Sequence, residues 1–349
     1  MGTQGQSTDI VFLSGRRTPF GTFGGSLKGH SANDLGAVAA TSALEEAGVV
    51  PEEIGHVIFG NALQTSADAI YHARHVGLQA GVPEEVPALT VNRLCGSGFQ
   101  AIVSAAQEIL LGQADVCLAG GAESMSQAPH VVRGARWGQL RLGEAGEFFE
   151  DLLWQALTDT RCDMSMAQTA EELAGRYEVL REEADRIAYE SQQRAKRAWD
   201  EGRFDAEVVP MTLRTRKGEL EFRTDEHMRP DTTMEALAGL RPYFRKDGLV
   251  TAGNASGIGD GAAATVVASG EWAERKGLKP LARLVSWGVA GVDPRIMGIG
   301  PAPSSRKALE SAGLTLDDMD LVEVNEAFAP QVAAVARDLE LDMEKTNVN

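Results

Sequence analysis

Two distant stretches of the chain repeat one pattern, and this repeat most constrains the fold. ALEEAGVVPEEIGHVIFGNA at 43–62 aligns without gaps on ALESAGLTLDDMDLVEVNEA at 308–327. Each reads as a helix end, a glycine stop, an acidic turn and an apolar strand. Similar αβ units also recur by convergence, but here the order ALExAG, acidic turn, strand and a later VN is shared. The sequence therefore predicts two similar α/β halves.

The region between the two copies has a different character. Residues 164–199 are rich in Ala, Glu, Arg and Leu at helical spacing, which predicts helices. Alternation and turn signals then predict a hairpin around Lys217 and Gly218. The stretch VTAGNASGIGDGAAATVVAS at 250–269 predicts a loop of small residues that lets a ligand approach the backbone, followed by an apolar strand or helix.

Composition excludes several classes of protein. The 349 residues are 43% hydrophobic and 24% charged, which suits a globular protein of about two domains. The formal net charge of −17 argues against nucleic acid and anionic membrane surfaces as partners. No apolar run is long enough for a membrane helix, and MGTQGQSTDI lacks the basic and apolar regions of a signal peptide. We therefore expect a cytoplasmic protein.

The three cysteines are few, odd in number and without metal-ligand spacing, so they support neither a disulfide framework nor a metal site. Cys95 follows PALTVN, which predicts a strand, and precedes FQAIVSAAQEILLG, which predicts a helix. A helix N-terminus favours a thiolate, and the neighbouring glycines leave amides free for an oxyanion, as in a nucleophile elbow. Cys95 could equally be a small buried apolar residue, as we expect for Cys117 and Cys162. The local pattern leaves both interpretations open.

A second candidate site, Asn325 to Phe328, follows the apolar stretch DLVEV. An Asn and a Glu at a strand end can hold a water or orient a base. A helix N-cap followed by a first-turn acid gives the same pattern. No histidine is adjacent to either motif, and His72 and His75 share one helix face, where we expect them to be structural. The glycines at 257–261 fit neither a P-loop nor a dinucleotide fingerprint.

Five segments in order carry a family resemblance: VNRLCGSGFQAI, GGAESMSQAPH, VTAGNASGIGDGAA, MGIGPAP and DLVEVNEAFAPQ. With them the chain resembles the thiolase family, in particular the mitochondrial-type degradative branch of 3-ketoacyl-CoA thiolases. The resemblance implies an α/β fold of duplicated βαβαβαββ halves in a five-layer αβαβα core. It places the N-terminal half at 1–124 and 259–280, an inserted CoA-binding loop domain at 125–258, and an incomplete C-terminal half at 281–349.

The resemblance also implies an activity. 3-Ketoacyl-CoA would be cleaved with CoA to acetyl-CoA and a shortened acyl-CoA, or formed by the reverse Claisen condensation, in fatty-acid β-oxidation. Cys95 matches the nucleophile that carries the acyl group, and its amide matches half of an oxyanion hole. Asn325 matches the residue that fixes the water of the other oxyanion hole, beside Glu326. Positions that line the CoA channel match Leu157, Met166, Arg229, Phe244, Ala252, Ser256, Ala327 and Phe328, each of which could instead be a packing residue.

Further implications concern partners and cofactors. CoA and its thioesters would be substrates, with no metal and no permanently bound cofactor, and the enzyme would form a homodimer or homotetramer. The family continues after VN with GGxxALGHPxGxSG, whose His activates the nucleophile, and later with CxGGG, whose Cys is the acid and base. Because the sequence ends at Asn349, before both motifs, we expect this chain by itself to be impaired or inactive.

Three alternatives follow. A biosynthetic acetoacetyl-CoA thiolase usually carries His before the channel Met, whereas Ser165 precedes Met166 here, which favours the degradative branch. A decarboxylating condensing enzyme shares the fold and nucleophile but uses two histidines, and the Asn325 motif speaks against it. An inactive acyl-CoA-binding protein would fit the missing base, but the Cys95 turn and the Asn325 motif favour catalysis.

Overall fold

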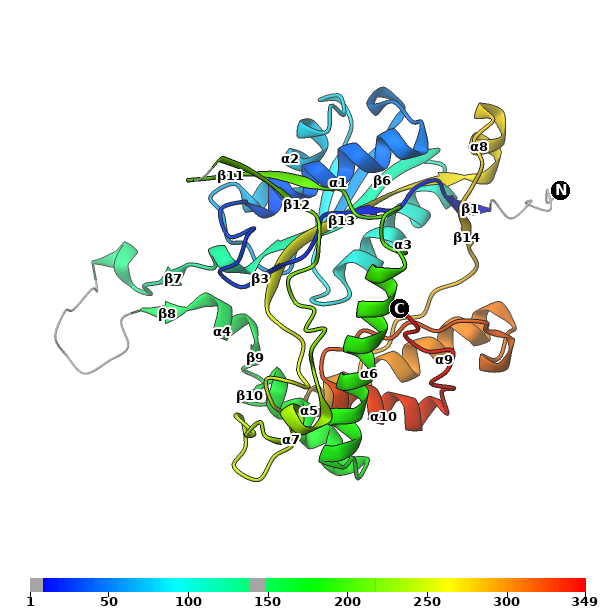
Figure 1. Ribbon diagram of the computed structural model, residues 1–349. Helices are drawn as coiled ribbons and strands as arrows, with labels where there is room; N and C mark the ends of the chain where they lie inside the picture. Colours follow the sequence, from blue (N-terminus) through cyan, green and yellow to red (C-terminus); the bar gives the residue numbers. More distant parts are fainter. Residues whose placement is uncertain (1–8, 139–148, 217) are drawn as a thin grey trace. The chain divides into compact units, whose positions relative to one another are not determined.

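In the computed structural model, contacts divide the chain into two compact units (Figure 1). The structure describes residues 9–138, 149–216 and 218–349. Unit 1 comprises Met1–Pro129, Asp205–His227 and Ile258–Val285, and unit 2 comprises His130–Phe204, Met228–Gly257 and Ser286–Asn349. The resemblance predicts a different division, into 1–124 with 259–280, 125–258 and 281–349. That division remains a prediction.

Unit 1 is built on a mixed β-sheet with the strand order β14-β1-β13-β6-β4-β5. The central strands β13 and β6 are antiparallel, whereas β4 runs parallel to both β6 and β5. Two short strands, β2 and β3, also pair with β13. The bounds are β1 Ile10–Phe12, β2 Arg16–Arg17, β3 Gly21–Thr22, β4 His56–Gly60, β5 Ala88–Val91, β6 Val116–Ser124, β13 Gly259–Ser269 and β14 Ala282–Leu284.

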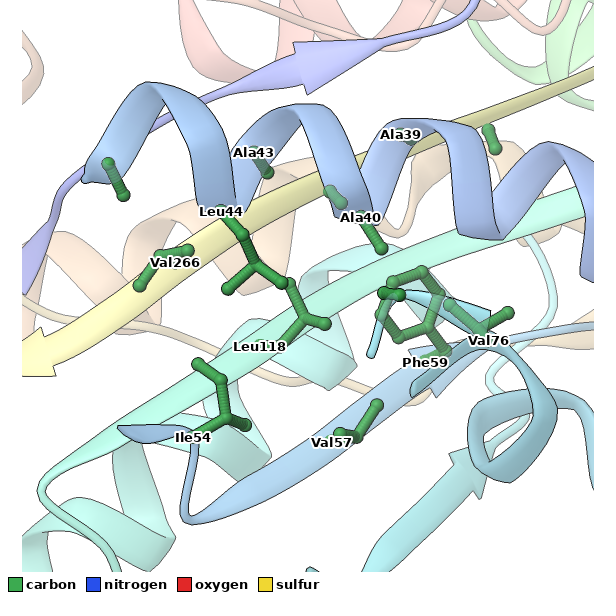
Figure 2. Close-up of a cluster of buried hydrophobic side chains, with 14 of the residues drawn as sticks. Ala39, Ala40, Ala43, Leu44, Ile54, Val57, Phe59, Val76, Leu118 and Val266 are labelled. Atoms are coloured by element: carbon green, nitrogen blue, oxygen red, sulfur yellow. The ribbon is translucent and has the colours of Figure 1, made fainter. Parts of the chain in front are cut away.

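Both faces of this sheet are covered. Helix α1 (Ala32–Ala47) packs small side chains such as Ala40 and Ala43 against Leu118 of β6 and Val266 of β13 (Figure 2). Cys117 points to the opposite face, because side chains alternate along a strand, and its Sγ lies 3.9 Å from the carbonyl oxygen of Ala105 in α3 (Ser97–Leu110). A strand buried on both sides reads as the continuous apolar run VCLAGGA.

The remaining elements of unit 1 flank this core. Helix α2 spans His72–Gln79 and helix α8 spans Gly270–Lys276. Strands β11 (Met211–Thr215) and β12 (Gly218–Phe222) form an antiparallel pair, as the predicted hairpin requires. Lys217, where the turn was expected, lies outside the described residues.

The predicted repeat is visible in both units. In unit 1, α1 ends at Gly48 in the left-handed conformation (φ 65°), and the acidic turn Pro51–Glu53 leads into β4. In unit 2, helix α9 (Pro301–Ala312) ends at Gly313 (φ 67°), and the turn Leu316–Asp318 follows. Glycine suits these two positions because it adopts positive φ without a Cβ penalty. The first three parts of the repeated pattern are therefore confirmed.

The fourth part differs between the copies. The stretch 320–324, expected as a strand, makes only an isolated bridge between Val322 and Thr346. Regular pairing ends because Val324 donates its N–H, at 2.7 Å, to the side-chain oxygen of Asn347 instead of to a backbone carbonyl. Asn347 itself has a left-handed backbone (φ 50°), which turns the chain away. The strand prediction was wrong at this point.

Unit 2 is mainly helical. Its longer helices are α5 (Met166–Arg176), α6 (Arg181–Asp200), α9 and α10 (Ala329–Leu339). The first two confirm the helices expected within 164–199. Leu173 of α5 packs with Ala334 and Val335 of α10. Within the described ranges, no helix is both long and apolar enough to cross a membrane. The short elements are β7 His130–Val131, β8 Glu150–Asp151, α4 Leu152–Ala156, β9 Thr158–Asp159, β10 Met164–Ser165 and α7 Met234–Ala238.

Stability of unit 1 should depend on pH through His72. This ring is fully buried, its Nδ1 lies 2.7 Å from Oδ1 of Asn33, and burial lowers its pKa to about 4. The unfolded chain takes up this proton near pH ~6.5, so stability is lost as the pH falls from there toward the folded pKa. We expect His72→Asn, which keeps an amide donor toward Asn33, to remove on the order of 3 kcal/mol of this acid-induced loss.

Urea unfolding of wild type and variant at neutral and acid pH measures this difference. The variant is expected to be less stable at neutral pH, because a smaller side chain leaves a cavity. The two free energies of unfolding should then converge on acidification. Parallel pH profiles would show that His72 does not cause the acid sensitivity.

Candidate active site

Cys95 lies in unit 1, on the sharp turn that joins β5 to α3. The strand ends at Val91, the helix begins at Ser97, and the thiol is exposed. Leu94, directly before the cysteine, has a left-handed backbone (φ 49°), which is costly for a leucine. The predicted strand, turn and helix are confirmed. This is the geometry of a nucleophile elbow, in which local strain presents a side chain at a helix N-terminus.

Short hydrogen bonds close this turn. The hydroxyl of Ser97 donates to the carbonyl of Leu94 at 2.6 Å and accepts the N–H of Arg93 at 2.8 Å. The N–H groups of Gly96 and Ser97 donate to the carbonyls of Arg93 and Leu94, at 3.1 and 3.0 Å. The strained backbone is therefore held from both sides of Cys95.

The other two cysteines have different environments. Cys117 is fully buried in β6, and burial raises the pKa of its thiol to about 12. A thiol with such a pKa stays protonated and unreactive at neutral pH. Cys162 is partly buried in unit 2, where its Sγ lies 3.8 Å from the carbonyl oxygen of Asp159. Exposure on a strained turn distinguishes Cys95 from both.

Two loops of unit 2 that carry predicted site residues are joined by backbone hydrogen bonds. The N–H of Ser256 donates to the carbonyl of Ala327 at 3.0 Å, and the N–H of Ala329 donates to that of Asn254 at 2.8 Å. Ala255 and Phe328 form an isolated antiparallel bridge between them. The small-residue loop 250–257 and the loop 325–329 therefore form one piece of structure.

Buried acidic side chains fix the first of these loops. Glu171 of α5 accepts the N–H groups of Leu249 and Val250, at 3.0 and 2.8 Å. Asp185 of α6 is 2% exposed and accepts from the side chain of Asn254 at 2.8 Å. Its second oxygen accepts from Arg181 at 2.7 Å, which offsets the cost of burying the charge.

Apolar candidates pack next to these loops. Phe244 and Phe328 are partly buried against Val250 and the first turns of α5. The carbonyl of Leu157 accepts the N–H of Met166 at 2.9 Å, which brings these two predicted channel residues together. Ala252 and Arg229 are exposed, and the backbone N–H of Arg229 donates to Gln192 of α6 at 2.6 Å.

Asn325 and Glu326 have different surroundings although they are neighbours. The side chain of Asn325 is exposed. The carboxylate of Glu326 accepts hydrogen bonds from Ser191 of α6 at 2.6 Å and from the Asn347 amide at 2.7 Å. These contacts tie the loop that carries Asn325 to α6.

The structure brings the unit 2 candidates together in part, as two linked loops and one adjoining apolar cluster. Cys95 belongs to unit 1. Sequence reasoning missed the side chains that hold these segments, among them Glu171, Asp185 and Ser191. No local pattern singled them out, because the burial of Asp185 among the other acids of α6 is visible only in the structure.

Comparison with protein families and curated proteins gives consistent matches. The family described as "Thiolase, N-terminal domain" matches residues 10–271, and "Thiolase, C-terminal domain" matches residues 278–349. The chain is 54% identical over 340 residues to a mitochondrial 3-ketoacyl-CoA thiolase of Homo sapiens, covering 97% of this chain and 85% of that protein. It is 51% identical over 342 residues to a beta-ketothiolase of Cupriavidus necator, covering 98% and 86%.

Among solved structures, human mitochondrial 3-ketoacyl-CoA thiolase in complex with CoA matches with a TM-score of 0.94 at 53% identity. The match covers 98% of this chain and 85% of that one. It confirms the predicted α/β thiolase-like fold.

Proposed function

The chain is a member of the thiolase family of acyltransferases, and we propose that it cleaves a 3-ketoacyl-CoA with CoA to give acetyl-CoA and a shortened acyl-CoA. The observation that carries this proposal is the exposed Cys95 thiol on its strained turn at the start of α3. CoA and its thioesters are the substrates, and no cofactor is permanently bound.

In the proposed mechanism the Cys95 thiolate attacks the 3-keto carbon of the substrate. The bond between carbons 2 and 3 breaks, and its electron pair leaves as the enolate of acetyl-CoA, which takes up a proton. The thiol of CoA then attacks the acyl group on sulfur, loses its proton and releases Cys95. The reverse sequence is the Claisen condensation.

Residues of unit 2 have supporting roles in this proposal. Asn325 positions the water that stabilises the enolate, and Glu326 keeps its loop in place through Ser191 and Asn347. The channel that binds CoA is lined by Leu157, Met166, Phe244, Ala252, Ser256, Ala327 and Phe328. Arg229 binds the phosphates of CoA. The direct bond between Ser256 and Ala327 supports a shared surface for this group.

The proposal extends to a role in fatty-acid β-oxidation, a homodimer or homotetramer, and a cytoplasmic location. The mitochondrial names of similar proteins weigh against the location. The order Ser165 and Met166 supports a degradative role over a biosynthetic acetyl-CoA acetyltransferase. Cell fractionation tests the location, and relative rates on acetoacetyl-CoA and longer substrates test the branch.

Intact mass of the purified natural protein, with and without acetoacetyl-CoA, tests the proposed mechanism. We expect an acetyl adduct that peptide mapping assigns to Cys95 and that free CoA removes. An unchanged mass, or an adduct confined to Cys162, would contradict the acyl-Cys95 intermediate.

Arg229→Gln tests the proposed CoA contact. Losing a guanidinium that binds phosphate should raise KM for CoA about tenfold, because a charge-assisted hydrogen bond contributes about 1.5 kcal/mol or more. kcat should stay near wild type, since the contact is equal in ground and transition states. The control is Arg223→Gln. Arg223 is another exposed arginine, and it has an acidic neighbour. Its replacement should leave KM for CoA unchanged. Equal effects of both variants would contradict a specific contact.

A further inference from the structure

A partly buried acid, Glu123, organises the base of the Cys95 turn. Glu123, near the end of β6, accepts the N–H groups of Ala62 and Leu63, the latter at 3.2 Å. Asn61, which is 3% exposed, donates from its side chain to the carbonyl of Ala122 at 2.9 Å and toward Glu123 at 3.4 Å. The segment that leaves β4 is therefore pinned to the end of β6.

This pinned segment in turn holds Asn92. The Asn92 amide donates to the carbonyl of Ala62 at 3.1 Å, while its side-chain oxygen accepts the N–H of Leu94 at 2.9 Å. Both ends of one short side chain are thus used. A continuous chain of hydrogen bonds runs from Glu123 through Ala62 and Asn92 to the residue before the nucleophile.

Leu94 is the position where such support matters. A left-handed leucine persists only where its surroundings enforce that conformation, and small shifts at this residue change the direction of the next side chain. We propose that Glu123 and Asn92 are positioning residues that fix the backbone of Leu94 and thereby the direction of the Cys95 thiol. The inference rests on the proposed role of Cys95 as the nucleophile.

The chemistry of Glu123 agrees with this assignment. Burial raises its pKa to about 7, although the two backbone N–H donors lower it. Burying an ionised carboxyl group here costs stability, and side chains with perturbed pKa values cluster at functional sites. A second acid of unit 1, Glu226, accepts the N–H groups of Thr22 and Ser26, at 2.8 and 3.2 Å, and provides a matched comparison.

The test compares Glu123→Gln, Asn92→Asp and the control Glu226→Gln in the natural protein. Glutamine offers one acceptor where Glu123 offers two. Aspartate keeps the acceptor for Leu94 but loses the donor to Ala62, so it breaks the chain at one link. We expect the first two variants to lower kcat for acetoacetyl-CoA thiolysis about tenfold or more, with KM within about twofold, because misplacement of a reacting group acts on the chemical step.

The rate of Cys95 alkylation by iodoacetamide, followed by peptide mass, is the second measurement. It should fall in both test variants and stay at the wild-type rate in Glu226→Gln, even if that control lowers the thermal midpoint. Wild-type kcat and alkylation in Glu123→Gln and Asn92→Asp would overturn the inference. Equal losses in all three variants would also overturn it, by indicating a general effect on stability.

Failure of the proposed function has a different signature. If Cys95→Ser retained thiolysis, the nucleophile assignment would be wrong and this inference would fall with it. If Cys95→Ser were inactive while Glu123→Gln matched wild type, only the positioning role would be wrong.

Discussion

Cys95→Ser is expected to lower kcat/KM for thiolysis by about 10³-fold or more. A serine hydroxyl has a far higher pKa than a thiol, so the attacking anion is not formed at neutral pH. Cys95 is exposed, and replacing sulfur by oxygen there removes no core contact. Steady-state kinetics on acetoacetyl-CoA measures the loss of activity, and thermal unfolding checks that stability is unchanged.

Cys162→Ser is the matched control, because Cys162 is another accessible thiol of the described chain. It should retain wild-type activity and the wild-type acetyl adduct. A residual rate above about a tenth of wild type in Cys95→Ser would exclude an acyl-cysteine as the main route.

Gly60→Ala is expected to have the next largest effect, lowering kcat about 100-fold. Gly60 ends β4 beneath the start of α3, and a Cβ there would stand 2.6 Å from Cβ and 2.7 Å from the carbonyl carbon of Ser97. The backbone of Ser97 must therefore shift, and with it the turn that carries Cys95. Such overpacking should also cost about 1–3 kcal/mol of stability.

Gly29→Ala is the control, because a Cβ at Gly29 meets no atom within 4 Å and the position lies in the same unit. It should leave kcat and stability unchanged. A Gly60→Ala enzyme with wild-type kcat but reduced stability would show that the turn tolerates displacement of α3.

Signals that depend on neighbours along the chain predicted much of this fold. The two glycines that end repeated helices, Gly48 and Gly313, both have positive φ, because the left-handed ending is a local property. The turn at Cys95 was predictable for the same reason, since strand, glycines and helix follow one another. The strand at 320–324 was not, because strand pairing depends on what lies beside it.

The supports of the site could not be predicted in this way. Glu123 binds N–H groups of residues about sixty positions earlier, and Glu326 binds Ser191, 135 positions away. Almost any residue can donate a backbone N–H to a carboxylate such as that of Glu123. The identity of the donor residues therefore gives no sequence pattern from which the contact could be predicted. The sequence around Glu123 has one unusual feature, an acid near the end of an apolar strand. This feature does not predict which residues the acid contacts.

The position of β13 has a consequence for synthesis of the chain. This strand, Gly259–Ser269, lies between β1 and β6, which are complete by residue 124. At typical translation rates the ribosome needs on the order of ten seconds to add the intervening residues. During that time β6 exposes an unpaired apolar edge, a template for association with other nascent chains. Successful production therefore depends on how this early edge is shielded until its late partner emerges.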